Sequence, residues 1–335
     1  PRARLPRSLW AVARETRALV REPGEEFLEA CRKEVGDQVT SEYLQCQIEV
    51  GTRPHRSVAD AVGELTGLRK SLAKVCDAHG YAAIAASTHP FSPYSPDADT
   101  VALFHLDEPT GSTTAVNGGS LGFPGIASDP GTSAVTDVFQ PAAGFFGGAA
   151  GLANDRGIGI DASGNGDFST GGSDRFALAS IVGPDNAFTL EALVKPSTAD
   201  LSAHGHIWSG DSSGDRGFQF RIKNTEELEY NGLEFGGGNQ FHPLPPLDTG
   251  TWYHVALSYT EAGQPAGTGQ FRMFWTPVTA STTEAQEVHS WTAQAVDPGI
   301  VTQLVLGNEG RSTLDEGFPG LVDEARISRV ARAAD

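Results

Sequence analysis

The feature that most constrains this chain is a long series of short apolar segments after Thr100. Clusters of Gly, Pro, Asp and Ser interrupt the series at intervals of about 8–15 residues. Apolar and polar residues alternate well in FTLEALV (188–194) and WYHVALSY (252–259), and no helical stripe follows Thr100. This pattern predicts an all-β sandwich or barrel. The clearest expected strands cover residues 101–106, 188–196, 206–210, 217–222, 228–236, 251–259, 269–277, 302–308 and 320–328.

Charge and glycine content divide the chain near the Pro/Ser-rich run at residues 93–96. Residues 1–96 hold 13 of the 24 Lys and Arg and 12 of the 42 Asp and Glu, but only six of the 40 Gly. We therefore predict two domains, 1–96 and 97–335, the second strongly acidic. Acidity argues against nucleic acid or an anionic membrane as its partner, and no apolar run reaches the roughly 20 residues of a spanning helix.

The first region shows a mixed α and β pattern. Val58, Val62, Leu65, Leu68, Leu72 and Val75 recur at helical spacing. Ser57 is suited to cap a helix over residues 57–79, and Gly80 is suited to end it. A shorter helix is expected at 24–35, and strands are expected at 43–50 and 81–87. The strand at 43–50 presents Gln45, Gln47 and Glu49 on one face, either to solvent or to a polar site.

The cysteines and the first residues of the N-terminal region lead to further expectations. Three cysteines without motif spacing give neither a disulfide framework nor a zinc site. The first ten residues are basic and lack the apolar core of a signal peptide. Because the chain does not begin with Met, we expect that an upstream segment is missing.

Four segments in this region carry a family resemblance. Glu15-Thr16-Arg17, the segment 36–39, QCQIEVGT (45–52) and THPFS (88–92) are similar in order and spacing to the carboxylate–amine ligases, which are related to the ATP-dependent glutamate–cysteine ligases. The resemblance covers roughly residues 15–94. It implies coupling of a carboxylate to an amine through an acyl phosphate, with ATP and magnesium. It also implies that Glu49 binds the metal and that Gln45 and His89 lie near the site.

The same segment departs from the family pattern in several places. The family has an acidic strand of the type G-x-E-x-E upstream, where this chain has Arg14 and other basic residues. His55 stands in the place of the family's cysteine, and the family's nucleotide-binding half does not follow His89. One carboxylate cannot hold a magnesium–ATP cluster, so we expect a truncated or fused ligase piece that is inactive alone. A join artefact is the other interpretation.

The second region resembles the laminin-G-like and concanavalin A-like domains. VALFHLDE (101–108), FTLEALVKP (188–196), TWYHVALSY (251–259) and GFPGLVDEARISRVAR (317–332) carry this resemblance, with Leu193 where the family usually has Trp. The fold class that follows is mainly β, a jelly-roll sandwich preceded by a small α+β segment. The resemblance implies a non-catalytic module that recognises glycans or protein surfaces. The ligase activity and a self-associating adhesion protein remain the alternatives.

Candidate ligand contacts are acids in the Gly-rich loops of the sandwich and one aromatic residue in the expected strand 269–277. We expect Asp211, Asp215 and Trp275 to contact a ligand, and Asp161 and Asp167 to hold calcium, which prefers oxygen ligands. The same acids are also common turn formers. A glycosidase would need two carboxylates across a cleft, and no E-x-D-x-x-E strand is present. The histidines lack zinc-ligand spacing.

Other charged and aromatic residues are expected to be structural. Asp323, Glu324 and Arg326 are predicted to fix the last strand through ion pairs and hydrogen bonds, and Trp252 and His254 to be buried in the sandwich. Localisation stays open from sequence alone. The ligase family is cytoplasmic, whereas such sandwiches are usually exported.

Overall fold

The chain forms two compact units, residues 1–94 and 95–335. The computed structural model describes residues 6–13, 25–41, 47–84, 99–128, 134–152, 155–168, 172–199, 204–224, 226–279, 282, 284–311 and 316–332. Within these residues, no helix is both long enough and apolar enough to cross a membrane.

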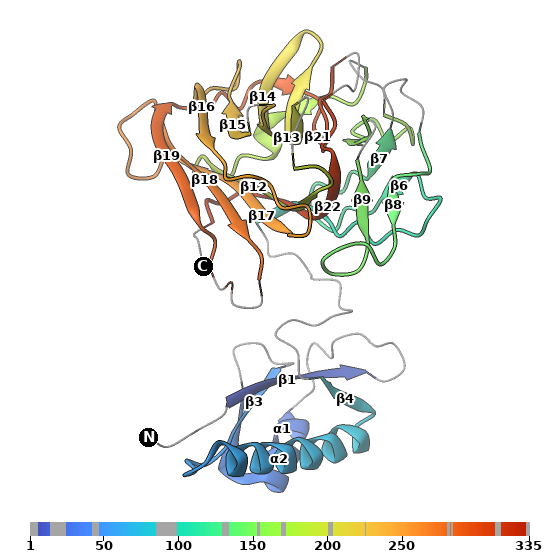
Figure 1. The fold of residues 1–335 in the computed structure, drawn as a ribbon, viewed down its shortest axis with the longest axis vertical. Helices are drawn as coiled ribbons and strands as arrows, with labels where there is room; N and C mark the ends of the chain where they lie inside the picture. Colours follow the sequence, from blue (N-terminus) through green and yellow to red (C-terminus); the bar gives the residue numbers. More distant parts are fainter. Residues whose placement is uncertain are drawn as a thin grey trace. The chain divides into compact units, whose positions relative to one another are not determined.

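The first unit is an antiparallel four-stranded sheet with two helices on one face (Figure 1). The strand order is β2-β3-β1-β4. The elements are β1 (Pro6–Ala13), α1 (Glu25–Val35), the 3₁₀ turn η1 (Gly36–Gln38), β2 (Val39–Ser41), β3 (Gln47–Gly51), α2 (Val58–Ala78) and β4 (Tyr81–Ile84). The central strand β1, which pairs with both β3 and β4, was not predicted from the sequence.

Helix α2 confirms the predicted start of the long helix and corrects its apolar face. The Ser57 hydroxyl accepts a hydrogen bond from the Asp60 backbone N–H, and Gly80 has φ of +73°. Val62, expected in the core, is 49% exposed. The buried positions are Ala61, Leu65, Leu68, Leu72 and Cys76. The three leucines were predicted, and the buried face is rotated so that it includes Ala61 and Cys76 and leaves out Val62.

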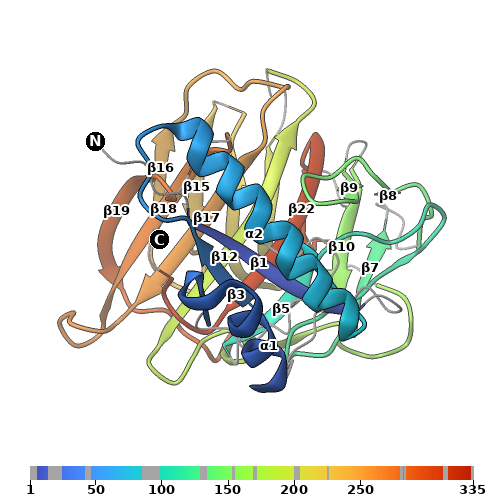
Figure 2. The ribbon, with the colours of Figure 1, turned by 90° about the horizontal axis from the view of Figure 1, so that it is seen from below.

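The second unit is a sandwich of two large antiparallel sheets (Figures 1 and 2). In the first sheet, which we call the β12 sheet, the order is β19-β18-β17-β12-β22-β9-β8, with β5 also paired to β22. Its strands are β5 (Thr100–Phe104), β8 (Phe139–Gln140), β9 (Ala149–Gly151), β12 (Ala187–Pro196), β17 (Tyr253–Thr260), β18 (Thr268–Pro277), β19 (Glu287–Gln294) and β22 (Gly320–Ser328).

In the second sheet, which we call the β13 sheet, the order is β16-β15-β14-β13-β21-β10-β7-β6. Its strands are β6 (Thr114–Ala115), β7 (Gly125–Ser128), β10 (Gly157–Ile160), β13 (Gly205–Ser212), β14 (Asp215–Ile222), β15 (Glu227–Asn231), β16 (Asn239–Pro243) and β21 (Val305–Leu306). A small pair, β11 (Phe176–Ala177) with β20 (Val301–Thr302), and the 3₁₀ turn η2 (Leu178–Ser180) complete the described elements.

The alternation seen in the sequence decides which side chains enter the core between the sheets. On β17, Tyr253, Val255, Leu257 and Tyr259 belong to the main core cluster, and the side chain of His254 contacts Glu191 rather than that cluster. The mainly-β sandwich and most of its expected strands are thus confirmed. The predicted strand 228–236 was too long. β15 ends at Asn231, and the chain then turns through Leu233 and Gly236–Gly238, which all have positive φ.

Candidate functional site

The β8–β9 hairpin carries two exposed aromatic side chains at its tip. Phe145 is 40% exposed and Phe146 is 54% exposed. Their ring centroids are 4.7 Å apart in an edge-to-face arrangement, and the Phe145 ring lies 6.3 Å from that of Trp252. Exposed large apolar residues that lie together often mark interaction sites. We call Gly144–Gly148 the aromatic loop.

Two carboxylates, the buried Asp323 and the exposed Asp107, hold the aromatic loop in place. Asp323 Oδ2 accepts the backbone N–H groups of Phe145 and Phe146 at 2.7 and 3.1 Å. Asp107 Oδ1 accepts the N–H of Gly148 at 2.6 Å. The loop also requires glycine, since a Cβ at Gly144 would lie 1.7 Å from the Gly148 carbonyl oxygen. The two phenyl rings are therefore presented on a fixed backbone.

The Asp323 carboxyl that holds this loop has a raised pKa. Its burial raises the pKa of the carboxyl, the charge of Glu324 raises it further, and the backbone N–H donors lower it, with a result of about 6. Glu324 in turn accepts from His105 at 2.8 Å and raises the pKa of that imidazole. The prediction that Asp323 fixes the last strand through hydrogen bonds agrees with these contacts, and its bonds reach the aromatic loop as well.

Arg326 takes the structural role expected of it, whereas His254, expected to be buried, has a side chain that is 28% exposed. Both contact the Glu191 carboxylate on β12: His254 Nε2 lies 3.0 Å from Oε2, and Arg326 Nε donates to Oε1. Glu191 is 7% exposed. Trp252, at 9% exposure, lies in a small cluster with Ala149 and Leu193.

A buried charged network covers the outward face of the β13 sheet. Asp211, expected in an open loop, lies fully buried within β13. It accepts two hydrogen bonds from Arg216, both 2.9 Å, and one from Gln219 at 2.7 Å. Because these donors already occupy the carboxylate, its geometry is that of a structural anchor. Asp215 begins β14 and pairs with Arg175.

Trp275 does not present its ring to solvent. It is 2% exposed, belongs to the core cluster and stacks on Tyr253 with 4.5 Å between the ring centroids. The expectation of an exposed stacking ring at this position was wrong, because β18 turns Phe271, Met273 and Trp275 together into the core.

The acids proposed as calcium ligands lie in one Gly-rich loop. Asp161 is 1% exposed, and its carboxylate accepts from the N–H groups of Gly164, Asn165 and Gly166 and from the Ser163 hydroxyl. Burial acts to raise its pKa, but these bonds outweigh it and leave the pKa lowered. Calcium at Asp161 would have to replace several of these bonds. Asp167 is exposed.

The predicted ligase residues are only partly within the described structure. Gln45 and His89 lie outside the described residues. Glu49 lies on β3, where its backbone pairs with Ser8 of β1 and Thr40 of β2. His55 is bound to Glu64, with Nε2 2.6 Å from Oε2, and the other Glu64 oxygen accepts from Gln38 at 3.0 Å.

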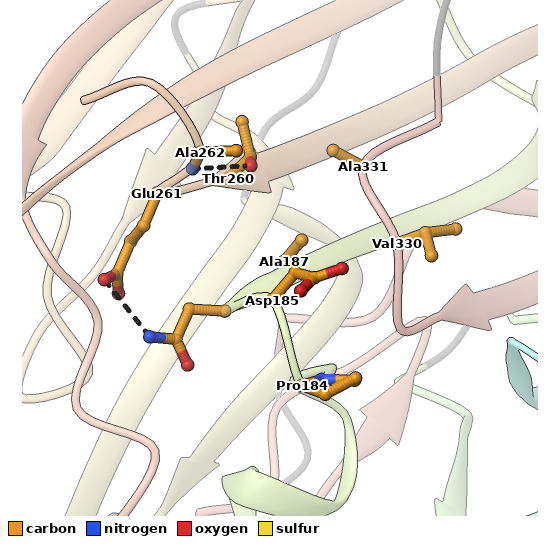
Figure 3. Close-up of a pocket in the computed structure, with 9 residues that line it drawn as sticks. Pro184, Asp185, Ala187, Thr260, Glu261, Ala262, Val330 and Ala331 are labelled. Atoms are coloured by element: carbon orange, nitrogen blue, oxygen red, sulfur yellow. Dashed lines mark hydrogen bonds between the residues drawn. The ribbon is translucent and has the colours of Figure 1, made fainter.

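A shallow open depression lies where β12 begins and β17 ends (Figure 3). Asp185, Glu261, Val330 and their neighbours line it. Asn186 Nδ2 donates to Glu261 at 3.2 Å. The Ala262 N–H donates to the Thr260 hydroxyl, as Figure 3 shows. Its two acids already belong to local turns, and it brings together none of the residues predicted from sequence.

Sequence reasoning missed the aromatic loop although a signal was present. Two adjacent Phe residues lie between glycines in GFFGG, and glycines weaken a strand and often mark a bend, so the segment favours a turn that carries both rings. The sequence does not show that the two rings are exposed, because the residues that anchor the loop, Asp107 and Asp323, lie in distant parts of the chain.

Comparisons with known proteins find a match to a different family model in each half of the chain. Residues 170–335 match the family model of the concanavalin A-like lectin/glucanases superfamily. Residues 9–102 match that of glutamate–cysteine ligase family 2. Both resemblances noted in the sequence are thereby confirmed.

Curated relatives match the N-terminal unit. A candidate glutamate–cysteine ligase 2 of Ruegeria pomeroyi is 41% identical over 81 residues, which is 24% of this chain and 21% of the relative. One of Rhodospirillum rubrum is 42% identical over 88 residues, 25% of this chain and 23% of the relative. The chain thus spans about a fifth of the length of these relatives.

Solved structures similar to this chain include two sialidase-related proteins. The CBM40 of the Ruminococcus gnavus IT-sialidase bound to α2,3-sialyllactose is 17% identical, with a TM-score of 0.39, and the match covers 56% of this chain and 92% of that one. The Trypanosoma rangeli sialidase in complex with sialic acid is 11% identical, with a TM-score of 0.37. That match covers 88% of this chain and 40% of the sialidase chain.

Proposed function

We propose that residues 97–335 form a non-catalytic recognition module for glycans, and that the aromatic loop is its contact surface. The observation that carries this proposal is the exposure of Phe145 and Phe146 on a backbone fixed by Asp323 and Asp107. The apolar C–H face of a sugar ring packs on an aromatic ring, and a rigid loop loses little entropy on binding.

The charge of the module favours neutral glycans. Residues 97–335 contain 30 of the 42 acidic residues and 11 of the 24 basic ones. Long-range repulsion lowers the association rate of anionic sugars at low ionic strength. We therefore expect neutral polysaccharides to bind more tightly than sialylated or sulfated ones.

The proposal is tested with the full chain on a glycan array and in pull-downs with insoluble polysaccharides, each with and without calcium. Calcium held by Asp161 and Asp167 would make binding depend on the ion. Neutral glycans captured by the wild type and lost in Phe146→Ala support the proposal. No capture on any arm, or equal capture by Phe146→Ala, contradicts it.

A second candidate function belongs to the N-terminal unit and rests on the 41% identity with the Ruegeria relative. It is ATP-dependent ligation of a carboxylate to an amine, with Glu49 as a magnesium ligand. Phosphate release from ATP in the presence of magnesium, glutamate and cysteine tests it. Release that Glu49→Gln abolishes supports ligation, and absence of release contradicts it for this chain.

A further inference from the structure

Three potential metal ligands meet on the outward side of the β13 sheet. They are His206 of β13 and two glutamates, Glu309 and Glu316, that follow β21. One ligand atom from each residue lies within 4.8 Å of the other two. Metal–ligand bonds to imidazole and carboxylate are about 2.0–2.2 Å, so ligands across one ion are separated by up to roughly twice that length.

The imidazole of His206 is held by Glu316 through one ring nitrogen. The residue is fully buried, and its Nδ1 lies 3.3 Å from the backbone carbonyl oxygen of Glu316 and 3.4 Å from Oε2 of the same residue. Those contacts place the proton on Nδ1 and leave a lone pair on Nε2. Nε2 is buried and has no hydrogen-bond partner. An unsatisfied buried nitrogen is costly, and a cation would satisfy it.

Asn308 fixes both glutamates relative to β13. Its side-chain oxygen accepts the backbone N–H of Glu309 at 2.8 Å and that of Glu316 at 3.2 Å. Its own carbonyl accepts from the Ser209 hydroxyl on β13 at 2.9 Å. The backbone at both glutamates is therefore fixed to β13 before any ion arrives.

The charged residues around His206, Glu309 and Glu316 include more acids than guanidinium groups, which favours a cation. In the part of this network that the structure describes, four carboxylates face three guanidinium groups: Asp211, Glu229, Glu309 and Glu316 against Arg216, Arg221 and Arg311. Arg311 contacts Glu309 through Oε2, and Arg221 contacts Glu316 through Oε2 at 2.6 Å.

We propose that His206, Glu309 and Glu316 form a structural site for a borderline divalent cation of the zinc class. One nitrogen and two carboxylate oxygens suit such an ion better than calcium or magnesium, which prefer oxygen alone. Glu309 is 1% exposed and the Glu316 side chain 18%, so the ion would be largely buried. It would join the segment that begins at Glu309 to β13. This proposal does not depend on glycan recognition.

The test is a zinc titration of the full chain, stripped with a chelator, by calorimetry. We expect one tight site in the wild type, weakened at least tenfold in His206→Gln and in Glu309→Gln. Glu229→Gln is the matched control, because it removes a buried carboxylate of the same network outside the triad; it should stay within about threefold of the wild type. Unchanged affinity in both triad variants, or an equal loss in Glu229→Gln, overturns the proposal.

Cobalt substitution in the wild-type chain keeps the test independent of how the variants fold. Cobalt at this site should show ligand-field bands without a thiolate charge-transfer band. Cysteines are the main competing ligands, although burial raises the pKa of Cys31 to about 12 and that of Cys76 to about 11. A thiolate charge-transfer band, or no cobalt spectrum at all, contradicts the site.

Discussion

The Glu191 carboxylate on β12 lies 3.0 Å from Nε2 of His254 on the neighbouring strand β17. Leu193 and His254 are the cross-strand pair, so this contact runs diagonally across the sheet. Arg326 of β22 binds the other oxygen of the same carboxylate. One buried acid thereby links three adjacent strands of the β12 sheet.

Glu191 should make stability fall at low pH. Burial acts to raise its pKa, but His254 and Arg326 outweigh burial and lower the pKa to about 2. A lowered folded-state pKa gives stability that is present above the unfolded value near 4.5 and is lost as pH falls toward 2. The contribution is on the order of 3 kcal/mol.

Urea unfolding of the wild type and Glu191→Gln between pH 7 and pH 2 checks this. The variant should be less stable at pH 7, and its stability should vary less between pH 4.5 and pH 2. The exposed Glu234→Gln serves as the control and should follow the wild type. Parallel curves for wild type and Glu191→Gln would refute the assignment.

Asp323 should titrate near pH 6. Because its folded-state pKa is raised, the stability it contributes is present below the unfolded value of 3.8 and is lost as pH rises through about 6. Asp323→Asn should therefore gain stability relative to the wild type between pH 4 and pH 6, by on the order of 2 kcal/mol. Carboxyl carbon shifts in NMR measure the pKa directly, and a midpoint near 4 would count against the burial effect.

Truncating Phe146 should affect binding rather than stability. Its ring is 54% exposed, so Phe146→Ala should cost less than about 1 kcal/mol of unfolding free energy. Glycan affinity should fall at least about tenfold, as for a hot-spot residue. Phe241→Ala removes a ring that is 50% exposed on β16 and packs near Lys223, and should leave binding unchanged. Equal losses in the two variants would mean that the aromatic loop is not the contact.

Trp275 should behave as a core residue. Trp275→Ala should cost about 3–5 kcal/mol, since it removes a buried ring stacked on Tyr253. Trp275→Phe should cost clearly less, because it keeps an aromatic ring and removes an indole N–H that is buried without a hydrogen-bond partner. Thermal unfolding measures both. Lost glycan binding in a fully folded Trp275→Phe would restore the original ligand-contact hypothesis.

The N-cap of α2 should stabilise the first unit and leave the stability of the second unit unchanged. Ser57→Ala removes the acceptor of the Asp60 N–H and should destabilise residues 1–94 by about 1 kcal/mol. Ser57→Asn, another good cap, should recover most of the loss. Hydrogen exchange of α2 amides reports on this unit, and unchanged protection in Ser57→Ala would contradict the role of the cap.

Local patterns in the sequence determined the class of each unit. The strand alternation on β12 and β17, the Ser57 cap and the turn-forming glycines act over a few residues, so they can be seen without a fold. The rotation of the α2 stripe away from Val62 could not be seen this way, because it depends on which helix face meets the sheet. The central strand β1 lacked a pattern of its own and gains its place by pairing with β3 and β4.

The candidate sites were decided by tertiary structure. His206 is 110 residues from Glu316, and Phe145 is 178 residues from Asp323. No spacing rule reaches across such separations, which is why the histidines gave no sign of a metal site. Burial likewise reversed the reading of Asp211 and Trp275, since a charged or aromatic residue looks the same in sequence whether it faces solvent or the core. Short-range periodicity in the sequence therefore determined that the second unit is a β-sandwich. Long-range strand pairing determined which side chains come into contact.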